Sequence, residues 1–157
     1  MLAVPTKRFD RAIVSYLTKE ETDALIAAPD QSRWIGRRDH ALLTLAIQTG
    51  VRVSELTSLR CQDVHLGTGP HVQITGKGRK QRATPLTKHT VAVLREWLEE
   101  RAGQPGQPLF PTSRGRALSR DAIALLAAKH ANTASRRCPT LHNKTVTPHT
   151  LRDTQPR

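Results

Sequence analysis

A short stretch of the sequence, residues 147–154, combines the residue types that phosphate chemistry needs. Thr147 and Pro148 suit the cap and the first turn of a helix, because a threonine hydroxyl accepts a hydrogen bond from a free amide and proline has no unpaired N–H there. His149 and Arg152 lie three residues apart, which places them on one face of that helix. An imidazole beside a guanidinium, next to the free amides of a helix start, fits a phosphate site. A surface turn with an accidental His and Arg is the alternative interpretation.

A second candidate group surrounds Arg52. Gly50 is expected to end a helix in the left-handed conformation, and a short helix is expected to start at once with Val51. Glu55 follows Arg52 by three residues, so it is expected to share a helix face with Arg52 and to hold the guanidinium in one pose. The alternative is an ordinary surface ion pair, which contributes only about 0.3–0.5 kcal/mol.

A basic β-hairpin is predicted next. From residue 71 the apolar positions alternate, which is typical of a half-buried strand, and residues 76–78 form a Gly-Lys-Gly turn before a second strand at residues 81–86. The predicted tip is strongly basic and carries Lys77, Arg79, Lys80 and Arg82. Such a tip can enter a DNA groove or follow a phosphate strand, or it can be a solvated edge that resists aggregation. A further basic turn carries Arg114 and Arg116 as candidate DNA contacts.

The remaining segments predict helices around a buried core. A Thr18–Glu21 capping box begins one helix, and residues 34–49 are apolar on most of the circumference, as in a buried central helix. Thr87 and Ser119 are expected to cap two further helices, the second of which ends near residue 134. The expected fold is therefore mainly α with a small antiparallel β-hairpin sheet.

The composition favours a nucleic-acid partner. The chain has 157 residues and a formal net charge of +12, from 25 Lys and Arg against 13 Asp and Glu, and such an excess is typical of nucleic-acid binding. Aromatic residues make up 3% of the chain, so base stacking is not expected to be the main binding mode. Cys61 and Cys138 predict reduced thiols rather than a disulfide framework or a zinc site. We find neither an apolar run of membrane-spanning length nor a signal peptide, and we expect a cytoplasmic protein.

Three motifs together resemble the catalytic domain of tyrosine recombinases, the phage-integrase family. They are a T-G-x-R-x-S-E-L box at residues 49–56, a G-K-G turn at residues 76–78 and an H-x-L-R box at residues 149–152. Each box is moderately specific, and the three in this order and spacing form a strong match that extends over residues 7–154.

The resemblance implies a set of catalytic roles. Arg52 matches the first catalytic arginine, and Lys77 matches the hairpin lysine that protonates the 5′-oxygen leaving group. Lys80 is the rival to Lys77. His149 and Arg152 match the histidine and the second arginine, and all these groups are expected to surround one scissile phosphate. In the family a tyrosine attacks this phosphate to form a 3′-phosphotyrosyl link, and neither a metal nor another cofactor takes part.

The chain also departs from the family pattern. Asp153 stands where a histidine is usual, the later Gly-His pair is missing, and the one tyrosine in the sequence is Tyr16. Nothing in the sequence near Tyr16 would activate it as a nucleophile. We therefore expect residues 1–15 to be a linker or arm, and residues 16–157 to be a recombinase-like catalytic domain that lacks its C-terminal part.

Three functional hypotheses follow. In the first, the chain is a truncated catalytic domain of a site-specific recombinase or integrase of a mobile element. It binds double-stranded DNA, alone or with other recombinase subunits, and does not form the covalent intermediate by itself. In the second, it is a non-catalytic DNA-binding module, either a regulator or a decoy of full-length recombinases. In the third, it is a decayed remnant that folds poorly.

Overall fold

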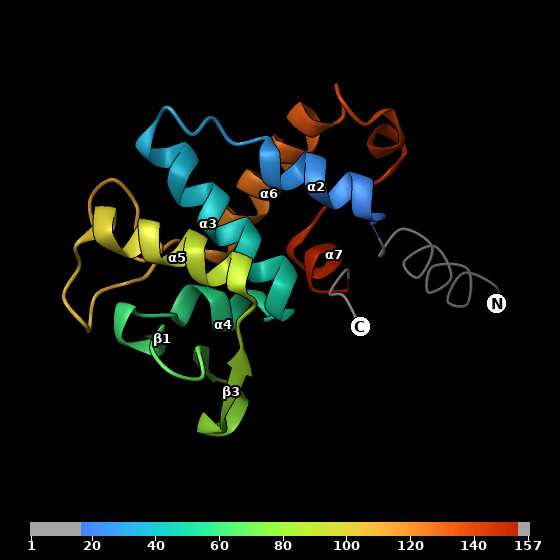
Figure 1. Cartoon of the computed structure of the whole chain (residues 1–157). Helices are drawn as coiled ribbons and strands as arrows, with labels where there is room; N and C mark the ends of the chain where they lie inside the picture. The colour runs from blue at the N-terminus through green and yellow to red at the C-terminus, as the bar shows by residue number, and fades with distance from the viewer. Residues whose placement is uncertain (1–16, 154–157) are drawn as a thin grey trace, which may run out of the picture.

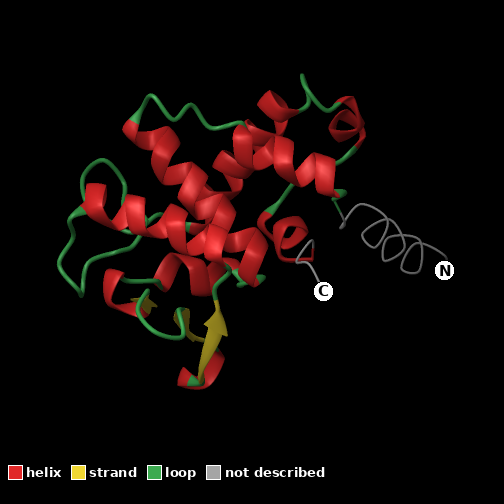
Figure 2. Cartoon of the chain, in the orientation of Figure 1, coloured by secondary structure: helices red, strands yellow, loops and turns green. Residues whose placement is uncertain are grey.

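The computed structural model describes residues 17–153, with the backbone but not the side chains of His149, Arg152 and Asp153. Helices form most of this part, and a small antiparallel sheet lies at one edge (Figures 1 and 2). The predicted mainly α fold with a small hairpin sheet is therefore confirmed. The elements are α2 (Lys19–Ala27), α3 (Trp34–Thr49), α4 (Val53–Ser58), β1 (Val64–His65), β2 (His71–Thr75), β3 (Gln81–Pro85), α5 (Lys88–Arg101), α6 (Arg120–Ala134) and α7 (Pro148–Asp153), with short 3-10 turns at Cys61–Asp63, Lys77–Arg79 and Pro139–Asn143.

The central element is α3, as the sequence predicts. Leu42, Leu43 and Leu45 on this helix are completely buried, and α2, α5 and α7 pack against it. In Figure 1, α3 crosses the middle of the molecule between α5 and α6. Burial of each such leucine contributes about 1.5–3 kcal/mol, so packing around α3 is a main source of stability.

The helix starts follow the predicted caps. Thr18 and Glu21 form a capping box at α2, in which the Thr18 hydroxyl accepts from the Glu21 amide at 3.1 Å and the Glu21 carboxylate accepts from the Thr18 amide at 2.8 Å. The hydroxyls of Thr87 and Ser119 cap α5 and α6 in the same way. Short-range hydrogen bonding therefore sets these boundaries.

The sheet within residues 17–153 has three antiparallel strands in the order β1–β2–β3. Val72 and Ile74 on β2 are fully buried, and the register pairs Val72 with Thr84 and Ile74 with Arg82. The predicted hairpin is thus confirmed, while the two-residue strand β1 is an addition to it, because a strand of that length has no alternating pattern to detect.

A buried polar cluster connects α3 to α6. The carboxylate of Asp39 accepts hydrogen bonds from Arg38 at 2.8 and 3.0 Å, and its other oxygen lies 2.7 Å from Nε2 of His130. The Arg38 guanidinium also donates to the backbone oxygen of Pro111 at 3.1 Å, which attaches the following turn to α3. Buried charges are tolerated when they are paired and hydrogen-bonded in this way.

A second buried carboxylate connects α2 to the segment before α7. Glu21 is inaccessible to solvent, and besides capping α2 it accepts hydrogen bonds from Thr140 at 2.6 Å and from the ammonium of Lys144 at 2.5 Å. Burial raises the pKa of Glu21, but the hydrogen bonds from Lys144, Thr140 and the Thr18 amide outweigh burial and lower the pKa to about 2. The carboxylate therefore stays charged and crosslinks two segments more than 100 residues apart.

No helix within residues 17–153 combines the length and the apolar character that crossing a membrane requires.

The lowered pKa of Glu21 predicts a specific form of acid destabilisation. A group with a depressed pKa stabilises the fold above its ordinary pKa of 4.5, and this contribution is lost as the pH falls towards about 2. The loss is on the order of 3 kcal/mol. We expect Glu21→Gln to flatten this part of the pH dependence of the free energy of unfolding, measured by urea denaturation between pH 2 and 6. Glu20→Gln, which removes an exposed carboxylate from the same turn, should leave this pH dependence unchanged. Equal curves for the two variants would contradict the role given to Glu21.

Candidate functional site

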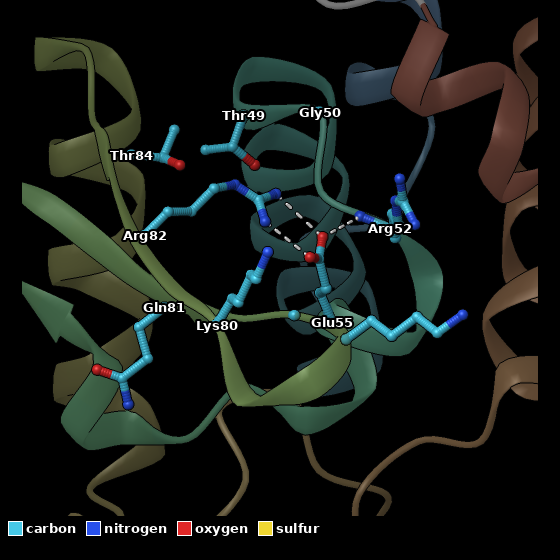
Figure 3. Close-up of a pocket in the computed structure, with 10 residues that line it drawn as sticks. Thr49, Gly50, Arg52, Glu55, Lys80, Gln81, Arg82 and Thr84 are labelled. Atoms are coloured by element: carbon cyan, nitrogen blue, oxygen red, sulfur yellow. Dashed lines mark hydrogen bonds and ion pairs between the residues drawn. The ribbon is translucent and has the colours of Figure 1, made fainter.

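The candidate site is a cavity of about 680 Å³ where the end of α3, the start of α4 and the β2–β3 hairpin meet (Figure 3). These three elements supply all of its lining within the described part of the chain. The lining residues are Thr49, Gly50, Arg52, Glu55, Gly76, Lys77, Lys80, Gln81, Arg82 and Thr84. Two of the four predicted catalytic residues, Arg52 and Lys77, are therefore brought to one pocket from positions 25 residues apart.

The backbone at Gly50 directs Arg52 into this pocket. Gly50 ends α3 in the left-handed conformation, with φ of 69° and ψ of 28°, as predicted. Arg52 is then the extended N-cap residue of α4, which begins at Val53. The expected helix start at Val51 is wrong by two residues, because Arg52 is extended and serves as the N-cap, so the helix begins after it.

The partner of Glu55 differs from the expectation. The Glu55 side chain is 6% exposed, and its carboxylate accepts from the backbone amide of Arg52 at 2.8 Å and from both terminal nitrogens of Arg82 at 2.7 and 3.0 Å. The Arg52 side chain extends away from this carboxylate (Figure 3). The predicted pairing of Glu55 with the Arg52 guanidinium is thus wrong: an N-cap residue is not helical, so the three-residue spacing does not put the two side chains on one face.

The charge of Glu55 is maintained by these contacts. The Arg82 hydrogen bond lowers the pKa of Glu55 most strongly; burial raises it, and the Arg52 amide lowers it further. A bidentate pair between a guanidinium and a carboxylate is geometrically specific as well as strong. Glu55 therefore fixes the orientation of Arg82 and of the Arg52 backbone.

The hairpin tip presents two lysines to the pocket. The turn Lys77–Arg79 is tight, with positive φ at Gly78 and Arg79, and the Gly76 amide donates to the Lys80 backbone oxygen at 2.7 Å. Lys77 and Lys80 both line the cavity. In Figure 3 the Lys80 side chain extends towards Arg82 and Glu55. Lys80 thus remains a rival of Lys77 as the lysine nearest a bound ligand.

The other predicted DNA-binding residues occupy different places. Arg79 is exposed at the hairpin tip, whereas Arg82 lines the pocket. Arg114 and Arg116 are exposed on a turn that the Arg38–Pro111 hydrogen bond attaches to the first half of α3. Eleven residues of helix separate Arg38 from Thr49, and at 1.5 Å per residue the turn is attached roughly 16 Å along α3 from the end that lines the pocket.

The second catalytic box forms the predicted helix. α7 spans Pro148–Asp153, and the Thr147 hydroxyl accepts from the Thr150 amide at 3.2 Å, as expected for a cap. Leu151 is buried, and α7 packs against α3 and α6. The side chains of His149, Arg152 and Asp153 lie outside the described part of the structure, as do Tyr16 and residues 1–15.

Sequence reasoning missed the contact between Glu55 and Arg82. They are 27 residues apart and belong to different elements, so no helical or strand spacing links them. Gly76 was an indirect signal, because a Cβ at this position would lie 3.0 Å from Oε2 of Glu55. The glycine thus serves close packing of the hairpin against α4 as well as the turn.

The charge of the lining favours an anionic ligand. Arg52, Lys77, Lys80 and Arg82 contribute four cationic groups, while Glu55 is the one carboxylate among the lining residues. The Glu55 charge is already matched by Arg82. The remaining cations suit a group with several negatively charged oxygens, such as a phosphate.

The fold is that of the catalytic domain of tyrosine recombinases. The XerH site-specific recombinase, solved bound to its difH substrate, superposes with a TM-score of 0.73 at 26% sequence identity, over 89% of this chain and 41% of XerH. The model of the phage integrase family matches residues 15–155, and the chain therefore belongs to this family.

Sequence relatives agree with this membership. The chain is 51% identical over 154 residues to the Sinorhizobium fredii protein y4rC, whose name describes an integrase/recombinase, covering 98% of this chain and 46% of y4rC. It is 32% identical over 152 residues to the tyrosine recombinase XerC of Pelobacter propionicus, covering 96% of this chain and 48% of XerC. The chain spans about half the length of these relatives.

The environment of Glu55 predicts the effect of its neutralisation. Glu55→Gln keeps an acceptor for the Arg52 amide but loses the charged pair with Arg82. Hydrogen bonds to charged groups contribute roughly 1.5–3 kcal/mol, and the half-exposed Arg82 is partly screened by solvent, so we expect a loss of about 1–2 kcal/mol at pH 7 by urea denaturation. The loss should shrink in acid, because the wild-type advantage is present above pH 4.5 and disappears as the pH falls through the lowered pKa of Glu55. Glu99→Gln, an exposed change on α5, is the control, and an equal effect of the two changes would refute this account.

Proposed function

We propose that the pocket binds a phosphodiester group of double-stranded DNA and that the chain takes part in site-specific recombination as a tyrosine recombinase. The observation that carries the proposal is the cationic lining around one already paired carboxylate. Membership of the phage integrase family supports the reaction class. The XerH structure, which contains its difH substrate, supports a nucleic-acid ligand by analogy.

In this proposal Arg52 binds the non-bridging oxygens of the phosphate. Its guanidinium is exposed, and no hydrogen bond joins it to another described side chain. A planar fork of this kind can contact two oxygens at once and stabilise the charge that develops on them during reaction. We assign a second guanidinium contact with the same phosphate to Arg152, with His149 as the group that shares the proton of the nucleophile.

The lysines of the hairpin supply the proton in this proposal. As a tyrosine oxygen forms a bond to phosphorus, the bond from phosphorus to the 5′-oxygen breaks, and Lys77 or Lys80 gives this oxygen its proton. We favour Lys77 because it is the residue that matches the family motif. The chemistry of the proposal requires no metal and no other cofactor.

Residues outside the pocket extend the DNA contact. Arg79 at the hairpin tip, together with Arg114 and Arg116 on the turn beside the first half of α3, would meet phosphates further along the duplex. The net charge of +12 supports such an extended contact. We propose residues 16–157 as a tyrosine-recombinase-like catalytic domain, with residues 1–15 as a linker or arm.

The role of Arg52 can be tested by DNA affinity. We expect Arg52→Gln to weaken duplex binding roughly ten- to 150-fold, which corresponds to 1.5–3 kcal/mol for a hydrogen-bonded charge. The slope of log K against log salt should also fall by about 0.9, as for one lost phosphate contact. The measurement is a fluorescence anisotropy titration at several salt concentrations. Lys129→Gln removes the same charge from α6, outside this pocket, and unchanged binding by Arg52→Gln relative to this control would end the assignment.

A nicked suicide duplex tests the covalent step separately. Tyr16 is the one tyrosine in the 157 residues, and nothing near it in the sequence would activate its hydroxyl. We expect the 157-residue polypeptide on its own to bind the duplex without forming a protein–DNA adduct, as judged by a denaturing gel. An adduct that survives denaturation would contradict this expectation and assign the complete cleavage step to the polypeptide. Binding without an adduct is also what a non-catalytic DNA-binding module would show, and adding a recombinase that supplies a tyrosine distinguishes the two.

A further inference from the structure

The pair formed by Glu55 and Arg82 joins the two halves of the pocket. Arg82 lies on β3, opposite Ile74 in the β2–β3 register, while Glu55 lies in the first turn of α4. Both terminal nitrogens of Arg82 donate to the two oxygens of Glu55, at 2.7 and 3.0 Å. The hairpin is therefore tied to α4 by a bidentate pair of fixed geometry.

The same carboxylate also sets the position of both backbones. Its Oε1 atom accepts the Arg52 amide at 2.8 Å, and its Oε2 atom lies so close to Gly76 that a Cβ there would be 3.0 Å away. Gly76 directly precedes Lys77. One carboxylate thus constrains the position of Arg52 relative to Lys77.

The burial of Glu55 keeps Arg82 in this pair. The carboxylate is 6% exposed, whereas the Arg82 side chain is 47% exposed. If Arg82 turned towards a DNA phosphate, the buried carboxylate would lose its charged partner, and leaving a buried charge unpaired is strongly unfavourable. Arg79, three residues earlier on the same hairpin, forms no ion pair with a carboxylate among the described residues.

We infer that Arg82 is a positioning residue, which holds the hairpin so that its lysines face the phosphate bound by Arg52, and that Arg82 is not itself a phosphate contact. The part of this inference that concerns a bound phosphate rests on the proposed function. The attachment of the hairpin to α4 rests on the geometry alone. It replaces the assignment of Arg82 to the DNA-binding residues that its basic neighbours indicated.

The first test uses the full chain without DNA. We expect Arg82→Gln to speed hydrogen exchange of the Arg52 and Gly76 amides about tenfold, because local opening then costs less free energy. The Arg52 amide proton should also shift in the NMR spectrum as its carboxylate acceptor moves. Arg79→Gln, which removes the same charge from the same hairpin, should change neither. Adding Arg82→Gln to Glu55→Gln should give little further acceleration, since both changes remove one interaction.

The second test measures the salt dependence of duplex binding. A lost phosphate contact lowers the slope of log K against log salt by about 0.9. We expect that decrease for Arg79→Gln and no decrease for Arg82→Gln. Arg82→Lys, which keeps the charge but not the bidentate geometry, covers the case in which the glutamine variant does not fold. It should show hydrogen exchange between wild type and Arg82→Gln, with the wild-type slope.

Each outcome decides the matter. A fall in slope for Arg82→Gln equal to that for Arg79→Gln would overturn the inference, and so would unchanged exchange of the Arg52 and Gly76 amides. If the wild-type chain binds no DNA, the proposed function fails, yet the exchange measurement still shows whether Arg82 holds the hairpin to α4. If Arg79→Gln also leaves the slope unchanged, the hairpin tip is no DNA contact, and the exchange measurement again decides the role of Arg82.

Discussion

The structure of the candidate site depends on one buried carboxylate. Glu55 accepts hydrogen bonds from the Arg52 amide and from the Arg82 guanidinium, and it packs against Gly76. These contacts come from both sides of the pocket, so the distance between its helical half and its hairpin half follows from the size of a single carboxylate. Burial of Val72 and Ile74 anchors the hairpin to the core, and the Glu55–Arg82 pair adds a polar constraint between the hairpin and α4.

Glu21 uses the same device elsewhere in the fold. Each of these glutamates is the third residue of a short helix, and each accepts the backbone amide at the helix start. Each is also buried and takes a second, cationic partner from a distant segment: Lys144 for Glu21 and Arg82 for Glu55. A cap alone could remain at the surface. Burial requires further donors to keep the carboxylate charged, and the distant cation provides them. In both cases a glutamate that caps a helix locally also connects that helix to a distant segment. Glu21 connects α2 to the segment before α7, and Glu55 connects α4 to the hairpin.

The sequence predicted those features that depend on near neighbours. Three such features are the capping box at Thr18, the left-handed end of α3 at Gly50 and the cap at Ser119. Each depends on a few adjacent residues, so the residue types were sufficient to predict it. The motifs also indicated that Arg52 and Lys77 belong to one site. Which cation pairs with Glu55 could not be predicted, because two arginines were available and the choice depends on the extended backbone at Arg52. That backbone follows from the position of Gly50 relative to α4, which spacing alone does not give.

The observed pairing also has a consequence for charge. Had Glu55 bound the Arg52 guanidinium, as the spacing indicated, the charge of this exposed residue would have been paired before any ligand arrived. Arg82 instead pairs with the carboxylate, and the Arg52 side chain is directed away from it. Lys77 and Lys80 at the hairpin tip are exposed, so their mutual repulsion is screened at physiological salt. A phosphate bound as proposed would make direct contacts with these cations. The pair between Glu55 and Arg82 therefore does two things at once: it holds the pocket in shape, and it leaves the positive charge of the other residues available for an anion.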